Sequence, residues 1–141
     1  MPPSTVSKKF IDTSGFYALL VRGDDRHAEA ASILQRAALR SGLFVTSDYV
    51  LDETATLLKA RALGHLVKPL LERVFQAEAC RVEWMDPARF AATQSYFLKH
   101  DDHNWSFTDC FSFVLMRELR LREALTKDGH FREAGFAALL A

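Results

Sequence analysis

Hydrophobic positions fall into two alternating patterns along this chain. Short apolar runs typical of buried strands are followed by longer stretches in which apolar residues recur at helical spacing. The runs predict strands ending at residue 11 and at residues 43–46, 81–85, 123–126 and 136–140. The longer stretches predict helices at residues 16–20, 28–38, 49–63, 66–79, 88–98 and 106–119, and a short segment at 131–133.

This alternation of strands and helices predicts an α/β fold. Parallel strands joined by helical crossovers form a sheet with helices on both faces, so we expect three α/β/α layers around a mostly parallel sheet. The length of 141 residues suits one domain spanning residues 1–141, with residues 1–7 as a flexible N-terminal leader.

Residues that favour helix ends support these boundaries. Ser106-Phe107-Thr108-Asp109 has the Ser-x-x-acid form of a helix start, and Pro87 suits a first helical position. We also expect a helix start at Asp24 or Asp25 and helix ends at Ser41-Gly42 and Gly64.

The composition limits the possible functions. Lys plus Arg and Asp plus Glu number 18 each, so no overall basic charge indicates a passive nucleic-acid binder. The opening residues lack the apolar stretch of a signal peptide, and no run is long enough to span a membrane, so we expect a soluble cytoplasmic protein. Cys80 and Cys110 lack the spacing of zinc or redox sites and are expected to be buried.

Four acids follow or flank the predicted strands. Asp12 and Asp128 come just after strands, whereas Glu53 and Asp109 belong to the first turns of helices. Each has an ordinary structural explanation, as a helix cap, a capping-box acid, a turn residue or a solvated surface acid. Because ligand sites in such sheets form beyond the carboxyl ends of the strands, we expect these four acids to converge.

Converging carboxylates predict a divalent metal site. Crowded carboxylates repel one another unless a cation neutralises them, and oxygen ligands suit Mg²⁺ or Mn²⁺. Such an ion can activate water against a phosphodiester. Basic residues near the acids would then contact the phosphates of such a substrate, with Arg61, Lys68, Lys127, Arg120 and Arg122 as candidates.

Four segments containing these acids resemble motifs of the PIN-domain ribonucleases, in particular the VapC-like toxins of type II toxin–antitoxin systems. The segments are Phe10-Ile11-Asp12-Thr13-Ser14, Leu51-Asp52-Glu53-Thr54, Ser106-Phe107-Thr108-Asp109-Cys110 and Ala124-Leu125-Thr126-Lys127-Asp128-Gly129-His130-Phe131. The resemblance spans nearly the whole chain, and its third and fourth motifs are the most specific. Gly129 departs from it, because many relatives carry a larger residue there.

The resemblance implies a PIN-like fold and an endoribonuclease that uses Mg²⁺ or Mn²⁺. It implies metal ligation by Asp12, Asp109 and Asp128, with Glu53 completing the acidic cluster. Hydroxyl groups of Thr13, Ser106 and Thr108 would support the site, and Lys127, His130 and Arg61 would contact the substrate. The family also implies a homodimer and a cognate antitoxin partner.

Other interpretations remain open at this point. A haloacid-dehalogenase-like phosphatase would need a second Asp where this chain has Ser14, which counts against that class. A PIN-type RNA-processing nuclease that is not a toxin and a non-catalytic PIN-like module both remain alternatives. We expect the stretch from His100 to His103 to be a solvated loop rather than a metal site.

Overall fold

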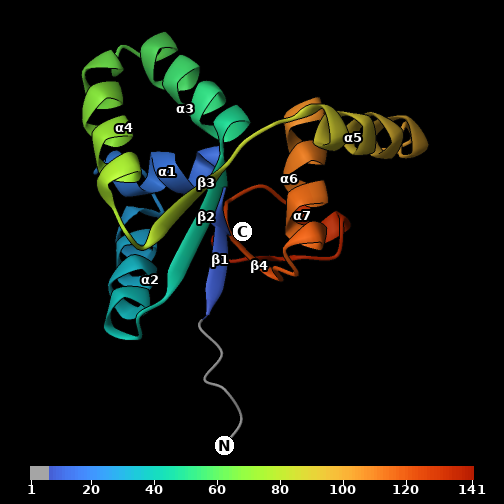
Figure 1. The fold of residues 1–141 in the computed structure, drawn as a ribbon. Coiled ribbons are helices and arrows are strands. Elements are labelled where there is room, and N and C mark those ends of the chain that lie inside the picture. Colours follow the sequence, from blue (N-terminus) through green and yellow to red (C-terminus); the bar gives the residue numbers. More distant parts are fainter. Residues whose placement is uncertain (1–6) are drawn as a thin grey trace, which may run out of the picture.

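The computed structural model describes residues 7–141, whose five strands form one sheet in the order β3-β2-β1-β4-β5 (Figure 1). Every neighbouring pair is parallel, which confirms the predicted parallel sheet. The leader expected at residues 1–7 lies outside the described residues, apart from Ser7. The strands are β1 (Lys8–Ile11), β2 (Leu43–Ser47), β3 (Cys80–Glu83), β4 (Glu123–Leu125) and β5 (Ala137–Ala138).

Helices cover both faces of the sheet, which gives the three expected layers. Figure 1 shows the first four helices on one side and the last three on the other. Within residues 7–141, no helix combines the length and apolar character needed to cross a membrane. The helices are α1 (Thr13–Leu20), α2 (His27–Leu39), α3 (Asp48–Ala60), the 3-10 turn η1 (Gly64–Leu66), α4 (Val67–Gln76), α5 (Pro87–Lys99), α6 (Phe107–Glu118) and α7 (His130–Glu133).

Two predicted helix starts are confirmed in detail. Pro87 opens α5 after Asp86, whose carboxylate accepts a hydrogen bond from the Arg89 N–H at 2.7 Å. The Ser106 hydroxyl accepts from the Asp109 N–H at 3.0 Å, and Asp109 Oδ2 accepts from the Ser106 N–H at 3.2 Å. This reciprocal pair is the capping box expected from the sequence.

Two predicted caps are wrong. Neither Asp24 nor Asp25 is the N-cap of α2, which begins at His27 after Arg26. The Asp24 carboxylate accepts from the Arg26 N–H at 2.9 Å, and both carboxylates bind Lys127. Gly64 begins η1 rather than ending α3.

Non-glycine residues take the left-handed conformation that ends α2 and α3. Ala62 (φ 60°) follows α3, and Ser41 (φ 52°) has this role after α2, where the Gly42 N–H donates to the Ala37 carbonyl at 2.8 Å. The predicted end at Ser41-Gly42 is therefore confirmed, with Ser41 rather than the glycine in the left-handed region.

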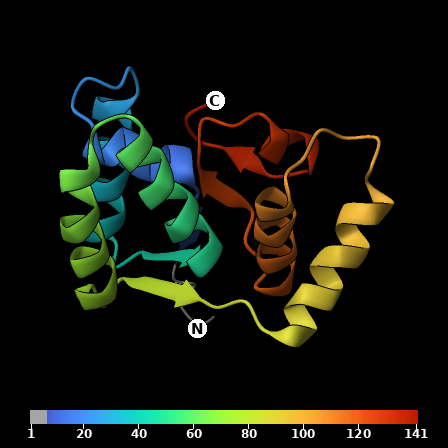
Figure 2. The ribbon, with the colours of Figure 1, turned by 90° about the horizontal axis from the view of Figure 1, so that it is seen from above.

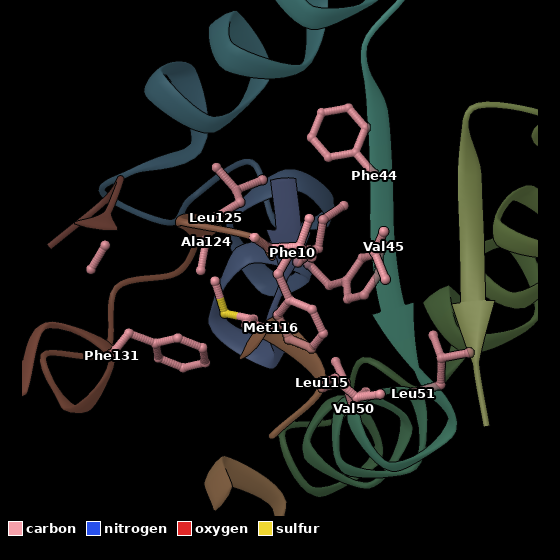
Figure 3. Packing of buried hydrophobic residues seen from close by; sticks show 14 of the residues in the cluster. Phe10, Phe44, Val45, Val50, Leu51, Leu115, Met116, Ala124, Leu125 and Phe131 are labelled. Carbon is pink, nitrogen blue, oxygen red and sulfur yellow. The ribbon is translucent and has the colours of Figure 1, made fainter. Parts of the chain in front are cut away.

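Aromatic side chains join the sheet to the second helical layer. Phe113 of α6 contacts Phe131 edge-on, with ring centroids 4.9 Å apart. The Phe131 ring centroid lies 6.4 Å from that of Phe10 of β1, and both residues are labelled in Figure 3. All three rings are fully buried. Cys110 is buried as expected, whereas Cys80 is only partly buried; burial raises the pKa of each thiol to about 11.

The strand order reverses between β1 and β4, and this reversal positions the site. From central β1 the chain runs outward through β2 and β3, and it then returns to the other side of β1 as β4 and β5. Ile11 and Leu125 are register partners, so the residues after each strand emerge side by side. A crevice at such a reversal is the usual ligand site of an open parallel sheet.

Candidate metal centre

Asp12 leaves β1 at this reversal and is the most buried of the predicted acids, with 5% of its surface exposed. It holds the N-cap position of α1, but only its backbone carbonyl bonds the helix, accepting from the Gly15 and Phe16 N–H groups at 3.0 Å. Its side chain makes no capping bond. The carboxylate is therefore left to interact across the crevice, where Oδ2 accepts from the Thr126 hydroxyl at 3.0 Å.

Gly15 allows α1 to begin directly against the end of β4. A Cβ atom at this position would lie 2.0 Å from the Leu125 carbonyl oxygen. Because that oxygen also accepts from the Asp12 N–H at 3.2 Å, neither element can easily move away. Glycine at position 15 is thus a steric condition for bringing Asp12 beside β4.

Thr126, which the sequence reasoning did not single out, connects both strand ends. Its buried hydroxyl donates to Asp12 and accepts from the Asp128 N–H at 3.0 Å. Because its only proton is directed at Asp12, the Ser14 hydroxyl, 3.0 Å away, must donate to Thr126. Thr126 follows Leu125 as Asp12 follows its partner Ile11, so strand register is the signal that could have identified it.

Glu53 reaches the same crevice from α3. Its Oε1 accepts from the Thr13 hydroxyl at 2.5 Å, which is the supporting role predicted for Thr13. The neighbouring Asp52 is exposed to solvent, so the helix directs only one of the two adjacent acids inward.

Asp109 and Asp128 meet around His130. The His130 Nδ1 atom lies 3.2 Å from Asp109 Oδ2 and 3.4 Å from Asp128 Oδ1. Asp128 Oδ1 also accepts from the His130 N–H at 2.9 Å, so this acid is a turn residue and a site residue together. One ligand atom from each of these three side chains lies within 4.8 Å of the others, which is a spacing that one metal ion could bridge.

The structure therefore brings all four predicted acids into one region, which we call the acidic centre. Asp12, Glu53 and Asp128 line one open cavity of about 350 Å³, together with Thr13, Ser14, Tyr17, Asp24, Leu57, Arg61 and Lys127. Asp109 does not line this cavity and borders it through Asp128 and His130. Asp12 lies outside the three-residue group around His130, although its charge interacts with that of Asp109.

The charges of the acidic centre are incompletely balanced. Burial, reinforced by the charges of Asp109 and Glu53, raises the pKa of Asp12 to about 7. Burial and the charge of Asp128 also raise the pKa of Asp109, against the opposing effect of its bonds to Ser106 and His130. Burial alone would lower the pKa of His130, but contact with Asp109 and Asp128 raises it. A bound cation would relieve this repulsion between carboxylates.

The donor set fits a hard divalent ion. Carboxylate oxygens suit Mg²⁺, and an imidazole beside them is also compatible with Mn²⁺. Of the other two hydroxyl groups predicted to support the site, Ser106 binds Asp109 through the capping box, whereas the Thr108 hydroxyl makes no hydrogen bond to the acids among residues 7–141.

The predicted substrate-binding cations differ in their surroundings. Lys127 Nζ lies 2.6 Å from Asp25 and 3.2 Å from Asp24, and its pKa is raised chiefly by the bond to Asp25. Its charge is therefore largely neutralised within the chain. Arg61 lines the cavity with its guanidinium 4.9 Å from the Tyr17 ring centroid, an arrangement that leaves its N–H groups able to bind a phosphate.

The stretch from His100 to His103 is not the fully solvated loop expected. Asp101 and Asp102 are exposed, but His100 and His103 are partly buried against Trp105. Among residues 7–141, the two imidazoles are not part of a group able to hold a metal.

Comparisons with known proteins identify the family of this chain. The family model of the PIN domain matches residues 9–137. The 23S rRNA-specific endonuclease VapC20 of Mycobacterium tuberculosis is 34% identical over 127 residues, which cover 90% of this chain and 94% of that protein.

Two solved structures resemble the fold. The crystal structure of Mycobacterium tuberculosis VapC20, described as a sarcin–ricin loop cleaving toxin, matches with a TM-score of 0.80 and 33% identity, covering 93% of this chain and 97% of that chain. FitAcB from Neisseria gonorrhoeae matches with a TM-score of 0.59 and 18% identity, covering 92% of this chain and 94% of that chain, and shows likeness of fold alone.

Proposed function

Because the chain belongs to the PIN-domain family, we propose that it is an endoribonuclease whose acidic centre works with a bound Mg²⁺ or Mn²⁺ ion. The observation that carries the proposal is the convergence of Asp12, Glu53, Asp109 and Asp128 at the reversal of strand order. Similarity to a 23S rRNA-specific endonuclease over 90% of the chain supports ribosomal RNA as the substrate class.

Each acid has a defined part in this proposal. Asp12, Asp109 and Asp128 hold the ion, and Glu53 completes the negative charge that retains it. When bound, the ion lowers the pKa of a water molecule and stabilises negative charge on the phosphate. Thr126 and Thr13 orient Asp12 and Glu53 through their hydroxyl groups, so these carboxylates need little rearrangement before reaction.

Substrate phosphates need a cation beside this acidic surface. Arg61 is the better candidate of the two cations in the cavity, because Lys127 is already paired with Asp24 and Asp25. Arg61→Ala should therefore weaken RNA binding more than Lys127→Ala.

Cleavage of RNA by the purified protein tests the enzymatic proposal. Wild-type protein should cleave 23S rRNA, or an oligonucleotide with its sarcin–ricin loop, with Mn²⁺ or Mg²⁺ but not with EDTA. Asp12→Asn should lower the rate by at least ~100-fold, because asparagine is nearly the same size as aspartate but lacks the negative charge that would hold the ion. Asp52→Asn, one residue from Glu53 but exposed, should behave like wild type. Undiminished cleavage by the Asp12 variant would reject the assigned centre.

We also propose that the protein is the toxin of a toxin–antitoxin pair, acting in the cytoplasm as a homodimer. The partner is supported by an apolar groove of about 330 Å³ between α1, α2 and α4, which could receive a peptide segment. Its lining residues include Leu19, Leu20, Leu34, Phe44 and Leu70. Its occupant in this proposal is a segment of the cognate antitoxin. Light scattering tests the dimer, because a monomer at assay concentration would contradict that assignment.

Growth assays separate a toxin from an RNA-processing enzyme. Expression should arrest growth, and co-expression of the antitoxin gene should restore it. Leu34→Glu places a charge in the groove and should abolish the rescue without reducing RNA cleavage. Leu39→Glu, on the same helix but outside the groove and highly exposed, is the matched control. Cleavage without growth arrest would instead favour RNA processing, and absence of both would favour a non-catalytic module.

A further inference from the structure

Three nearly parallel aromatic rings lie in the last turn of α5 and in the segment that joins it to α6. Tyr96 of α5 and Trp105 are nearly parallel, with centroids 6.0 Å apart and an interplanar angle of 15°. His103 stacks on Trp105 more closely, at 4.0 Å and 11°. Trp105 is thus nearly parallel to two other rings, and His103 packs on it more closely than Tyr96 does.

The base of this stack is fixed by the hydrophobic core. Trp105 is 7% exposed and meets Phe113 edge-on at 5.1 Å. Phe113 in turn contacts Phe131, which follows the acidic centre in the chain. The platform beneath His103 is therefore held in place by packing, which lowers the entropy lost when a ligand stacks on it.

The His103 ring is held along its edge, leaving one face without a packed ring among the described residues. Its Nδ1 atom lies 3.3 Å from Glu133 Oε1, and its main-chain N–H donates to the His100 carbonyl at 3.1 Å. The side chain is nevertheless 33% exposed. Trp105 packs on one face of the ring, and Glu133 and Asp102 lie near its two nitrogen atoms, so we infer that the opposite face accounts for part of this exposure.

A row of contacts connects this ring to the acidic centre. Glu133, which binds His103, also lies 4.0 Å from His130 Nε2, and His130 Nδ1 contacts Asp109 and Asp128. Figure 2 shows the segment between α5 and α6 passing beside α7, which carries His130 and Glu133. An RNA strand with a phosphate at the acidic centre could thus extend a neighbouring nucleotide over His103.

We propose that His103 is a stacking platform for an unpaired nucleobase next to the phosphate that is cleaved. The inference rests on the proposed ribonuclease function and adds a substrate-binding position to it. Sequence-specific proteins commonly hold splayed RNA bases on aromatic or histidine rings. A protein partner is less favoured, because the available surface is one flat ring beside the phosphate site rather than an extended apolar face.

Paired changes in protein and RNA test the platform. Cleavage is measured with wild type, His103→Ala, His103→Phe and the control His65→Ala, which changes an exposed histidine of η1. The substrates are the intact sarcin–ricin oligonucleotide and versions lacking one base at each position flanking the cut. His103→Ala should lower kcat/KM roughly 10-fold on intact RNA, whereas His103→Phe should stay within about 3-fold of wild type.

The missing base provides the decisive comparison. At one flanking position, removing the base should slow cleavage by wild type about as much as the His103→Ala substitution slows cleavage of intact RNA. Removing the same base should slow the His103→Ala variant little further. Wild-type rates for His103→Ala, or independent losses at every position, would overturn the proposal. Weakened antitoxin binding with unchanged RNA cleavage would do the same and assign this surface to a protein partner.

Failure of the proposed function would be recognised separately. If wild type cleaves none of these RNAs with Mn²⁺ or Mg²⁺, anisotropy with the same labelled oligonucleotides tests the platform through binding alone. Binding lowered roughly 10-fold by His103→Ala but not by His65→Ala would support stacking. Equal binding by both variants, or no binding by wild type, would reject it. Thermal unfolding checks that the variants remain folded.

Discussion

In the acidic centre, Asp12 and Glu53 are held by threonine hydroxyl groups, whereas Asp109 and Asp128 share the imidazole of His130. Hydroxyl groups orient a carboxylate without neutralising it, but a protonated imidazole also supplies positive charge. The first pair is accordingly the hydroxyl-held half, and the second is the histidine-held half.

The two halves differ in how far the charge of their carboxylates is balanced by neighbouring groups. Asp12 is almost completely buried and has a pKa of about 7, because burial is not compensated by a cationic partner. Burial also raises the pKa of Asp109, but its hydrogen bonds to Ser106 and His130 oppose that effect. A bound cation would therefore relieve the charge of Asp12, with which no side-chain cation is paired among residues 7–141.

The largest expected effect concerns stability without metal. The Asp12 pKa is about 7 in the folded protein and near 3.8 when unfolded, so its contribution to stability is complete below pH 3.8 and is lost as pH rises through about 7. In EDTA, Asp12→Asn should therefore gain stability relative to wild type between pH 4.5 and 8, by up to a few kcal/mol (on the order of 1.4 per pKa unit). Urea unfolding at several pH values measures this.

Adding Mn²⁺ provides the control for that experiment. A cation that binds only the folded protein should stabilise wild type at pH 8, by about 2.7 kcal/mol at one hundred times its Kd, and should stabilise Asp12→Asn less. A difference between the two proteins that stays constant across pH would contradict the assigned pKa. An equal response of both proteins to Mn²⁺ would contradict the role of Asp12 in holding the ion.

A smaller effect should follow removal of the hydroxyl that orients Asp12. Thr126→Val keeps the shape of a buried side chain but removes the bond to Asp12, and RNA cleavage should fall about 10- to 100-fold. Thr126→Ser retains the hydroxyl and should recover most of the rate. Thr93→Val is the matched control, since Thr93 is also buried but its hydroxyl has no hydrogen-bond partner among residues 7–141. Equal rates in Thr126→Val and Thr93→Val would show that the orientation of Asp12 is unimportant.

The smallest effect is expected at Lys127, at the edge of the hydroxyl-held half. Asp25→Asn removes one of the two carboxylates that pair with Lys127, so more of the positive charge of Lys127 becomes available to RNA. RNA binding should strengthen about 2- to 3-fold at low salt and change little at high salt, because exposed ion pairs are weak and screened. Asp101→Asn, in an exposed loop, is the control for a general change in net charge. Binding curves at two salt concentrations measure it, and a salt-independent gain would point to a change of structure instead.

The main elements could be predicted because their signals are local. The run at residues 43–46 lies within β2, and the Ser106–Asp109 pair forms the expected capping box at the start of α6. Each depends on side-chain pattern or on groups three residues apart. Gly64 failed as a cap because Ala62 could adopt the left-handed conformation that ends α3. Glycine favours that conformation but is not required for it.

The acids of the candidate site could also be named in advance, because strand ends and helix starts can be read along the chain. Their supporting contacts could not. The hydrogen bond from Thr126 to Asp12 joins residues 114 positions apart, and the clamp of Asp24 and Asp25 on Lys127 spans more than 100. Such pairs become visible only when strand register is known, since one residue of shift would direct each side chain elsewhere.

The amino-acid sequence by itself determined the alternation of strands and helices, the capping box of α6 and the identity of the four acids. Only the tertiary structure decided that β4 lies beside β1, that Gly15 must be small, and that His103 stacks on Trp105. The reason is physical: helical periodicity and capping act over a few residues, whereas burial, charge coupling and ring stacking depend on which distant segments are packed together.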